Sequence, residues 1–496
     1  MPRNLPLPVF ADAGKGYELK EKCGVFGVWG HPDCVRLAYL GLYAQQHRGQ
    51  ESAGIVISDG RRLTGHTGMG LVPEIFDEYT LDQLHRSLPS PKAAIAHNRY
   101  STAGGSVSCN AQPLLEAYIG GQVALAHNGN LINADPLRLQ FEEAGHLFHT
   151  TSDTEVIIHL LASPPQQRSH DPLGNALRRL QGAFSLVFLF PDRMEVARDP
   201  WGWRPLVIGR MPATEGRGWG AYIVASETVA LAVVGAELVR EVEPGEIVTI
   251  SDTGLRSRRF ADPAPRLAHC VFEHVYFANP ASRVFGQNVQ QARERMGEAL
   301  ANEAPVPADC VMPMPDSGRS AATGYARASG IPYREGIVPN RYVGRTFIKP
   351  TQAERLMAVR LKLNVIPDIV AGRRVIVVDD SIVRGTTTRA KMDQLRQAGA
   401  KEIHLRISCP PIRHPCYFGV DFASRDQLIA HGKETDDIRR YLGVDTLHYL
   451  SLGGLLSVMD RPAESYCTAC YSGDYRLDVD HPSTEVIADV EQARMF

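Results

Sequence analysis

The sequence predicts an α/β protein with more than one domain, and three observations support this prediction. The chain has 496 residues, which is enough for two or three domains. In its second half, the apolar and mostly β-branched run Val375–Val378 predicts a buried strand, and a helical pattern from about Arg389 to Ala398 follows it. In its first half, the residues from about Ala183 to Ile250 have the pattern of several short strands separated by turns.

The stretch from Val375 to Thr388 reads VIVVDDSIVRGTTT. Asp379 and Asp380 end the predicted strand, and a loop of glycine and hydroxyl residues leads into the helix, which Gly399 is placed to end. Such a helix N-terminus can bind a sugar phosphate, and the carboxylates can bind ribose hydroxyls or a magnesium ion that holds a pyrophosphate. The alternative is a buried strand followed by a capped helix, but two adjacent acids after four core residues fit it poorly.

This stretch resembles the phosphoribosyl pyrophosphate (PRPP) signature of the type I phosphoribosyltransferases, which have a parallel-sheet domain. The resemblance implies that the acidic pair contacts the ribose and the metal, and that the loop wraps the 5-phosphate. The residues that it assigns to PRPP are Asp379, Asp380, Ser381, Arg384, Gly385, Thr386 and Thr387.

The composition is that of an ordinary globular protein and argues against several functions. Hydrophobic residues make up 44% of the chain and charged residues 22%. The formal net charge of -2 gives no support for binding nucleic acid or membrane through a broad basic surface. No apolar run is long enough to span a bilayer, and the first 22 residues lack a signal-peptide pattern, so we expect a cytosolic protein. Nine cysteines are then more typical of metal ligands, a nucleophile and spare thiols than of disulfides.

The first apolar run, Cys23–Val28, predicts a buried strand that follows a poorly patterned leader, residues 1–22. A cysteine that begins a core strand is usually a small hydrophobic residue. Four motifs downstream change this interpretation, namely YAQQHRGQESAG from Tyr43, HNRYSTAGG from His97, LAHNGNL from Leu125 and SDTE from Ser152.

Together these motifs resemble the glutamine-hydrolysing domain of the class II amidotransferases, which are N-terminal-nucleophile (Ntn) hydrolases with a four-layer αββα fold. The resemblance implies that Cys23 becomes the first residue once the leader is removed. Its α-amino group, which titrates near ~8, can then take the thiol proton and return it. While Lys22 is attached, the same nitrogen is an amide and is not basic.

The resemblance assigns the other glutaminase roles by position. Arg99 pairs with the substrate α-carboxylate with help from Thr102, and Asp153 accepts from the α-ammonium group. Asn128 and Gly129 form the oxyanion hole from a side-chain amide and a backbone N–H. Asn-Gly is also the strongest hairpin signal, and we expect both interpretations to hold because the turn would aim the N–H. Structural roles are assigned to the histidines inside the motifs, His47, His97 and His127.

By the same resemblance, Phe184–Phe190, Tyr222–Ala225 and Glu246–Ile250 are strands that complete a sandwich of two sheets covered by helices. The stretch Leu255–Leu267 is rich in arginine and proline, so we interpret it as the linker to the second half.

A CxxC pair, Cys467 and Cys470, lies near the end of the second half. Such a pair is ambiguous among zinc, iron–sulfur and redox use, and by itself it favours zinc or redox chemistry. The chain around it resembles the iron–sulfur subgroup of the glutamine PRPP amidotransferases. This resemblance implies a structural [4Fe-4S] cluster with the ligands Cys270, Cys416, Cys467 and Cys470. Four buried thiols without a metal are the alternative.

Two further segments gain roles from the family. Val311–Ser320 reads as a strand and a polar turn, in which Ser317 lies by the metal and the pyrophosphate. The basic stretch Pro339–Arg355 would be an unremarkable surface loop elsewhere. In a PRPP enzyme it is a lid that brings positive charge to the leaving group and excludes water. Its basic residues include Arg341, Arg345 and Lys349.

The resemblance to the glutamine PRPP amidotransferases covers nearly all of the chain from Cys23 to about Tyr475. It implies conversion of PRPP, glutamine and water to 5-phosphoribosylamine, pyrophosphate and glutamate, the first committed step of de novo purine biosynthesis. Mg²⁺ and a [4Fe-4S] cluster are the implied cofactors, purine nucleotides the implied inhibitors, and a homo-oligomer the implied assembly. The expected segments are a leader (1–22), the glutaminase domain (23–255), the phosphoribosyltransferase domain (268–475) and a tail (476–496).

Three alternatives stay open. Another glutamine-dependent class II enzyme would share the first half but should lack the PRPP signature. A PRPP-binding regulator that binds nucleic acid would need a DNA-reading module and a basic face. A non-catalytic paralogue would not be expected to keep Cys23 together with Asp379 and Asp380.

Overall fold

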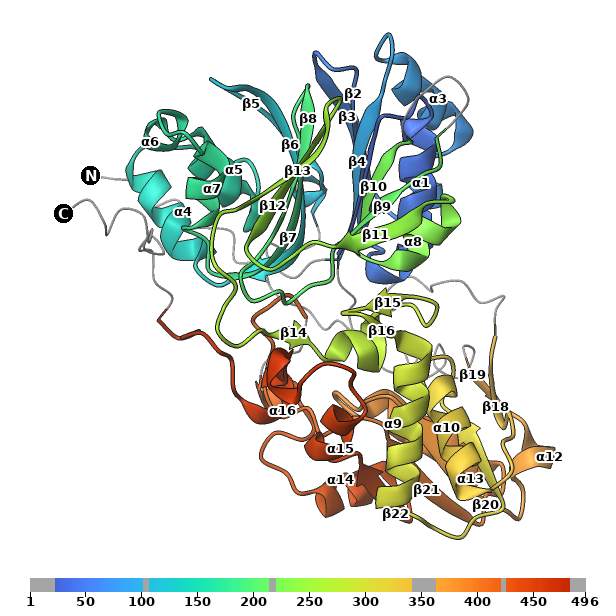
Figure 1. The fold of residues 1–496 in the computed structure, drawn as a ribbon. Coiled ribbons are helices and arrows are strands. Elements are labelled where there is room, and N and C mark those ends of the chain that lie inside the picture. The colour runs from blue at the N-terminus through green and yellow to red at the C-terminus, as the bar shows by residue number, and fades with distance from the viewer. Residues whose placement is uncertain (1–22, 101–106, 214–219, 341–362, 421–424, 482–496) are drawn as a thin grey trace, which may run out of the picture.

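A computed structural model of the chain describes residues 23–100, 107–213, 220–340, 363–420 and 425–481. Figure 1 shows two domains, with the first half of the chain above and the second half below. No helix in these ranges is long and apolar enough to cross a membrane. The two domains, which both combine helices and sheets, confirm the α/β architecture expected from the sequence.

The upper domain contains two antiparallel sheets. The first sheet has the strand order β11-β9-β10-β1-β4-β2-β3, and the second has the order β13-β12-β8-β7-β6-β5. The strands of the first sheet are β1 (Gly24–Trp29), β2 (Ser52–Ser58), β3 (Leu63–Met69), β4 (Ala93–Arg99), β9 (Val207–Arg210), β10 (Tyr222–Ala225) and β11 (Glu237–Glu241). Those of the second are β5 (Leu114–Tyr118), β6 (Gly121–Leu131), β7 (Gly182–Leu189), β8 (Arg193–Arg198), β12 (Glu246–Ser251) and β13 (Gly254–Arg259).

Three hydrophobic clusters divide the upper domain into four layers. One cluster lies between the sheets and joins Val25 and Ile95 to Val187 and Val196. The second packs helices on the outer face of the first sheet, and the third does the same on the second sheet. These helices are α1 (Cys34–Ala44), α2 (Val72–Ile75), α3 (Glu78–Arg86) and α8 (Thr228–Val233) on one side, and α4 (Ala134–Glu143), α5 (Thr154–Ala162), α6 (Pro164–Gln167) and α7 (Pro172–Leu177) on the other. The αββα order is confirmed.

The lower domain is built on a parallel sheet in the order β17-β20-β21-β22. The apolar run at Val375–Val378 is fully buried in β20, which pairs with β17 on one side and with β21 on the other. The strands are β17 (Cys310–Pro313), β20 (Arg374–Asp379), β21 (Glu402–Ile407) and β22 (Thr446–Tyr449). The helices of this domain are α9 (Val289–Glu303), α10 (Arg319–Ser329), α12 (Pro367–Val370), α13 (Thr386–Gln397), α14 (Thr435–Leu442), α15 (Leu452–Ser457) and α16 (Ala469–Ser472).

Short elements complete the structure, several of them at the junction of the domains (Figure 1). The paired strands are β14 (His269–Cys270) with β23 (Tyr466–Cys467), β15 (Arg283–Val284) with β16 (Gln287–Asn288), and β18 (Ile337–Pro339) with β19 (Leu363–Val365). Single helical turns are η1 (Gln46–Arg48), η2 (Ser108–Asn110), η3 (Glu273–Phe277), η4 (Arg425–Gln427) and η5 (Ala463–Ser465).

Two element boundaries differ from those expected. The linker predicted from Leu255 begins inside β13, which pairs with β12 as far as Arg259, so the second sheet is longer than expected. The helix predicted from Arg389 begins at Thr386, because Gly385 adopts φ 76° and turns the chain directly into it.

Candidate active site

Cys23 directly precedes β1, the central strand of the first sheet, and its side chain is buried. Its Sγ atom lies 3.6 Å from the carbonyl oxygen of Tyr100, the residue that follows β4. Burial raises the pKa of the Cys23 thiol, and the positive charges of Arg99 and Arg48 partly oppose this effect. A thiol in this environment needs a base before it can act as a nucleophile.

Two side chains hold the backbone at Cys23. The amide of Gly24 donates to Asn98 Oδ1 at 2.8 Å. Arg48 Nε donates to the carbonyl oxygen of Cys23 at 3.2 Å. Asn98 and Arg48 belong to β4 and η1, so the HNRY and HRGQ motifs converge on the start of β1.

Asn128 and Gly129 lie inside β6, opposite Ser185 and Phe184 of β7. The expected hairpin turn at these two residues is therefore wrong. The glycine is required because a Cβ atom at position 129 would lie 1.9 Å from the carbonyl oxygen of Ala183. Close approach of β7, not turn geometry, explains this Asn-Gly pair.

The side chain of Asn128 shares a partner with the first strand. Its Nδ2 lies 3.5 Å from Ser226 Oγ, which accepts from the amide of Val25 at 3.0 Å. Its Oδ1 is buried and has no hydrogen-bond partner within the described ranges. A buried amide oxygen without a partner is costly, and this one lies beside the strand that Cys23 begins.

Arg99 and Asp153 provide opposite charges near the thiol, since both act electrostatically on Cys23. Arg99 is buried at the end of β4, and Asp153 precedes α5. Asp153 Oδ2 accepts from the amide of Leu131 at 3.0 Å and lies 3.7 Å from His127 Nδ1. This arrangement can hold the carboxylate and the ammonium of one amino acid.

The sequence analysis missed a buried charge network that joins the domains. Arg48 contacts Glu227 at 2.5 Å and Glu273, a residue of η3, at 2.9 Å. Arg204 contacts the same Glu273 at 3.4 Å, and all four side chains are fully buried. Burial alone would raise the pKa of Glu227, but His47 and Arg48 hold it well below its usual range. An acid inside the apolar run VFEHVYF was the available signal for this network.

In the lower domain, Asp379 ends β20 and Asp380 follows it, and both side chains are buried. Asp379 Oδ1 accepts from the amide of Asp380 at 2.9 Å, and Ser381 Oγ donates to Asp380 Oδ2 at 2.7 Å. Burial and the negative charge of Asp380 raise the pKa of Asp379 well above its usual range. A bound cation would relieve this repulsion.

The turn that contains Ser317 lies at the same edge of the sheet as the acids. Pro313 of β17 pairs with Val378, and the amide of Met314 donates to the carbonyl oxygen of Val378 at 2.8 Å. A Cβ atom on Gly318 would lie 2.3 Å from that same oxygen, so the turn packs tightly against β20. The carboxylates of Asp379 and Asp380 and the hydroxyl of Ser317 are oxygen ligands of the kind that Mg²⁺ prefers.

The loop after the acids leads into α13. Thr386 and Thr387 form the exposed first turn of this helix, and Arg384 contacts Gln427. Gly385 is confined as well as left-handed, since a Cβ atom there would lie 2.5 Å from Ile429 Cδ1. The N-terminal amides of α13 and the threonine hydroxyls can bind an anion.

The fold brings together the four cysteines that the family resemblance selected. Cys270 and Cys467 are paired in the parallel strands β14 and β23, and the amide of Phe418 lies 3.4 Å from Cys416 Sγ. Burial raises the pKa of Cys470 well above its usual range, and the thiols of Cys467, Cys270 and Cys416 add to this effect. All four are free thiols. Over the described ranges, no group of three or more His, Cys, Asp or Glu side chains is arranged to hold a single metal ion.

Other predicted residues lie outside the described ranges. They are the leader 1–22, Thr102 of the glutamine site, and Arg341, Arg345 and Lys349 of the lid.

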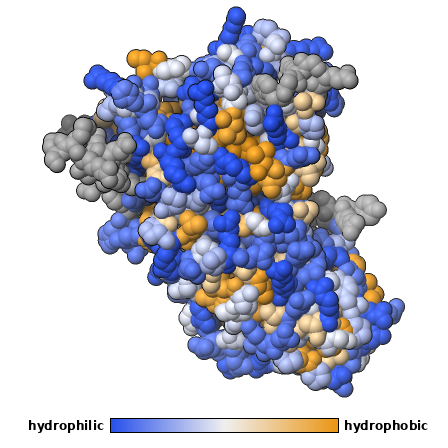
Figure 2. All heavy atoms as spheres, in the orientation of Figure 1, coloured by the Kyte–Doolittle hydropathy of each residue, from blue (hydrophilic) through white to orange (hydrophobic). Residues whose placement is uncertain are grey.

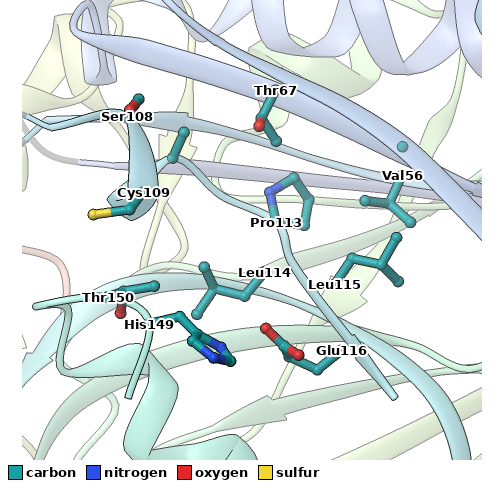
Figure 3. A pocket seen from close by; sticks show the side chains of 12 residues that line it. Val56, Thr67, Ser108, Cys109, Pro113, Leu114, Leu115, Glu116, His149 and Thr150 are labelled. Atoms are coloured by element: carbon teal, nitrogen blue, oxygen red, sulfur yellow. The ribbon is translucent and has the colours of Figure 1, made fainter. Parts of the chain in front are cut away.

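A separate pocket of about 380 Å³ opens between β3 and β5 at the edge of the sandwich (Figure 3). Leu115 contributes to its apolar wall, and the side chains of Glu116 and His149 point toward each other on another wall. Burial raises the pKa of Glu116, and His149 opposes this. The lining includes neither Cys23 nor Asp379, so the pocket is distinct from both candidate centres.

Comparisons with known proteins agree with this geometry. A family model described as a glutamine amidotransferase domain matches residues 97–233. The amidophosphoribosyltransferase of Bacillus subtilis is 47% identical and aligns over 93% of this chain and 95% of its own length. The enzyme of the same name from Methanothermobacter thermautotrophicus is also 47% identical, over 92% of this chain and 95% of its own.

Solved structures give the same result. The B. subtilis glutamine PRPP amidotransferase in complex with ADP and GMP superposes with a TM-score of 0.84 at 46% identity and covers 94% of this chain and 99% of that chain. A structure described as the allosteric regulatory enzyme of purine biosynthesis has a TM-score of 0.85 at 47% identity, covering 94% and 98%. The chain therefore belongs to the amidophosphoribosyltransferase family.

Proposed function

We propose that this protein transfers the amide nitrogen of glutamine to PRPP, giving 5-phosphoribosylamine, pyrophosphate and glutamate in the first committed step of purine biosynthesis. The observation that carries the proposal is the presence of two candidate centres in one chain. One is a buried thiol flanked by Arg99 and Asp153, and the other is the acid pair that precedes the N-terminus of α13.

In the first half-reaction, the Cys23 thiol attacks the side-chain amide of glutamine. The α-amino group of Cys23, freed by removal of the leader, takes the thiol proton and passes it to the departing ammonia. Asn128 Nδ2 and the Gly129 amide stabilise the negative oxygen of the tetrahedral intermediate. Arg99, Thr102 and Asp153 hold the two ends of the amino acid, and water later releases glutamate.

In the second half-reaction, ammonia displaces pyrophosphate from C1 of PRPP. Asp380 and Asp379 hold the ribose, while Ser381, the loop Arg384–Thr387 and the first turn of α13 bind the 5-phosphate. A magnesium ion bound by Asp379, Asp380 and Ser317 would neutralise the leaving group. The basic residues Arg341, Arg345 and Lys349 are proposed to close over it. Positioning supplies most of the catalysis, because the transition state needs little proton transfer.

We assign the four-cysteine set to a structural [4Fe-4S] cluster. A cluster is wider than a single ion, so its four thiolates need not converge on one point, as they must around zinc. Metal and sulfide analysis of anaerobically purified protein tests the assignment, and zinc in place of iron would overturn it. None of the nine cysteines forms a disulfide, which also fits a reducing, cytosolic location.

We also propose a homo-oligomer inhibited by purine nucleotides. The solved B. subtilis relative was complexed with ADP and GMP, which supports nucleotide binding by this chain. Nucleoside monophosphates resemble the phosphorylated sugar, so the 5-phosphate loop is one place where they can compete.

Cys23→Ala tests the central proposal. The variant should lose at least about a thousandfold of glutamine-dependent phosphoribosylamine formation, while synthesis from added ammonium stays within about twofold of wild type. Pyrophosphate and glutamate release, each measured with one substrate omitted, exclude the other glutamine-dependent enzymes and the PRPP-binding regulator. Survival of both activities, or loss of both from a folded protein, would contradict it.

A further inference from the structure

A loop of the lower domain lies against the β6 residue that we assign to the oxyanion hole. Gly419 in this loop adopts φ 94°. A Cβ atom at position 419 would lie 2.9 Å from both the carbonyl carbon and the carbonyl oxygen of Gly129, and 3.2 Å from its Cα. The backbones of Gly419 and Gly129 are therefore in direct contact, although they belong to different domains.

The residues before Gly419 fasten the same loop to the upper domain. Asn130 Nδ2 donates to the carbonyl oxygen of Tyr417 at 2.9 Å. Arg204 donates to the carbonyl oxygen of Phe418 through Nη2 at 2.6 Å and through Nε at 3.2 Å. The ring of Phe418 stacks on Trp203 with 4.3 Å between ring centroids. Three consecutive loop residues thus touch β6 or the segment that follows β8.

Gly129 is consequently confined from two sides. Within its own sheet, a side chain at this position would collide with the carbonyl oxygen of Ala183 on β7. Across the domain junction, Gly419 occupies the space beside the Gly129 carbonyl. Interiors packed this closely transmit small displacements, and a shift of the Gly129 Cα moves its N–H.

The loop also begins beside the second centre. It follows β21, where the amide of Ser408 donates to the carbonyl oxygen of Asp379 at 2.9 Å. It carries Cys416 of the four-cysteine set, three residues before Gly419. One segment therefore touches the acid pair, the thiol set and the candidate oxyanion strand.

We propose that Gly419 is a positioning residue for glutamine hydrolysis, and that the Cys416–Gly419 segment of the lower domain sets the oxyanion hole of the upper domain. The inference rests on the proposed function and goes beyond it, because it makes the glutaminase centre incomplete without the other domain. Oxyanion-hole geometry acts on the transition state and not on the bound substrate.

The test compares Gly419→Ala with Gly432→Ala in the full-length protein. Both glycines have positive φ, 94° and 66°, but an added Cβ at Gly432 meets nothing within 4 Å. Both variants therefore gain backbone strain, and only Gly419→Ala presses on Gly129. We expect Gly419→Ala to lower kcat for glutamine hydrolysis on the order of tenfold to a hundredfold, with the glutamine KM and the ammonium-dependent activity within about twofold.

An aldehyde analogue of glutamine, glutamate γ-semialdehyde, gives a second measurement. The Cys23 thiol adds to its carbonyl carbon, forming a C–S bond, and the thiol proton passes to the former carbonyl oxygen. That tetrahedral oxygen needs the oxyanion hole, whereas bound glutamate does not. Gly419→Ala should weaken inhibition by the aldehyde at least about tenfold and leave inhibition by glutamate unchanged.

Asn130→Asp keeps the inference testable if Gly419→Ala does not fold. It places a carboxylate oxygen against the Tyr417 carbonyl and should lower kcat in the same direction by a smaller factor. The inference would be overturned if the variants at Gly419 and Asn130 had the same kcat for glutamine hydrolysis as Gly432→Ala. It would also be overturned if glutamate binding and ammonium-dependent activity fell by the same factor as glutamine hydrolysis. A wild-type protein that makes no phosphoribosylamine would instead refute the proposed function.

Discussion

Two groups of buried charges in this molecule are built in opposite ways. One group is a chain of salt bridges that runs from Glu227 through Arg48 and Glu273 to Arg204, so that negative and positive charges alternate. Asp379 lies next to another acid, Asp380, and burial with this like charge raises its pKa well above the usual range. In the first group every charge forms a salt bridge with a partner of opposite sign. In the second, two carboxylates lie side by side without a salt bridge among the described residues, although the positive charge of Arg293 acts on Asp380.

This difference separates a structural role from a ligand-binding role. A buried ion pair persists only when its partners offset the cost of removing both charges from water. Two adjacent buried acids at the end of a strand also lose hydration, but they repel each other and do not form a salt bridge among the described residues. Such an arrangement is typical of a site that binds a cation or a ribose. The contrast can be broken by removing one charge from each group.

Glu273→Gln should have the largest effect on stability. It leaves two buried guanidinium groups, those of Arg48 and Arg204, without their shared anion. Loss of one partner from such a network typically costs about 3–5 kcal/mol in the free energy of unfolding. Denaturant titration of the purified holoprotein measures this directly.

The matched control is Glu78→Gln, which removes a surface partner of Arg36 at 2.7 Å. Both groups of that pair are mostly exposed, so water and salt replace the interaction. Equal effects from Glu273→Gln and Glu78→Gln would show that burial does not distinguish these acids.

Asp379→Asn should raise the free energy of unfolding, whereas Glu273→Gln should lower it. It removes the like-charge repulsion but keeps an oxygen that can accept from the amide of Asp380. We expect the substrate-free protein to gain on the order of 1–3 kcal/mol at neutral pH, while PRPP-dependent pyrophosphate release is lost. Glu227→Gln is the contrasting control, because His47 and Arg48 hold the pKa of the Glu227 carboxyl well below its usual range, so removal of its charge should destabilise the protein.

The pH dependence of stability follows from the pKa shifts of Asp379 and Glu227, which have opposite directions. Since the folded pKa of Asp379 is raised, its cost to stability is absent below about pH 4 and grows as pH rises through the folded value. The folded pKa of Glu227 is depressed, so its contribution is present above about pH 4 and is lost as pH falls. The gain from Asp379→Asn should thus vanish at acid pH, and a gain that persisted there would contradict this assignment.

His47→Gln should have the smallest effect. His47 Nε2 lies 2.8 Å from Glu227, but the imidazole is partly exposed and Arg48 still pairs with the acid. Glutamine can also donate to the carboxylate, so we expect about 1 kcal/mol or less. A loss of stability as large as that of Glu273→Gln would show that the network depends on the partly exposed His47 as much as on its buried acids.

The sequence predicted the local elements where one physical signal dominated. Val375–Val378 is apolar on both faces because it lies in the middle of a parallel sheet, and the strand at Tyr222–Ala225 has the predicted bounds. The prediction at Asn128-Gly129 was wrong because its local signal matches a turn, while the actual cause is the close approach of β7. The start of α13 was misplaced because Gly385 turns the chain within a single residue.

By itself, the sequence determined the order of the elements, the two families of motifs and the chemistry that each can perform, since these depend on residue type and spacing along the chain. Only the tertiary structure decided which distant residues meet. Arg48 with Glu273 and Gly129 with Gly419 are separated by hundreds of positions, and neither pair has a periodicity that could reveal it. Such contacts follow from how two domains pack, which depends on the shape of the whole surface and not on any local pattern.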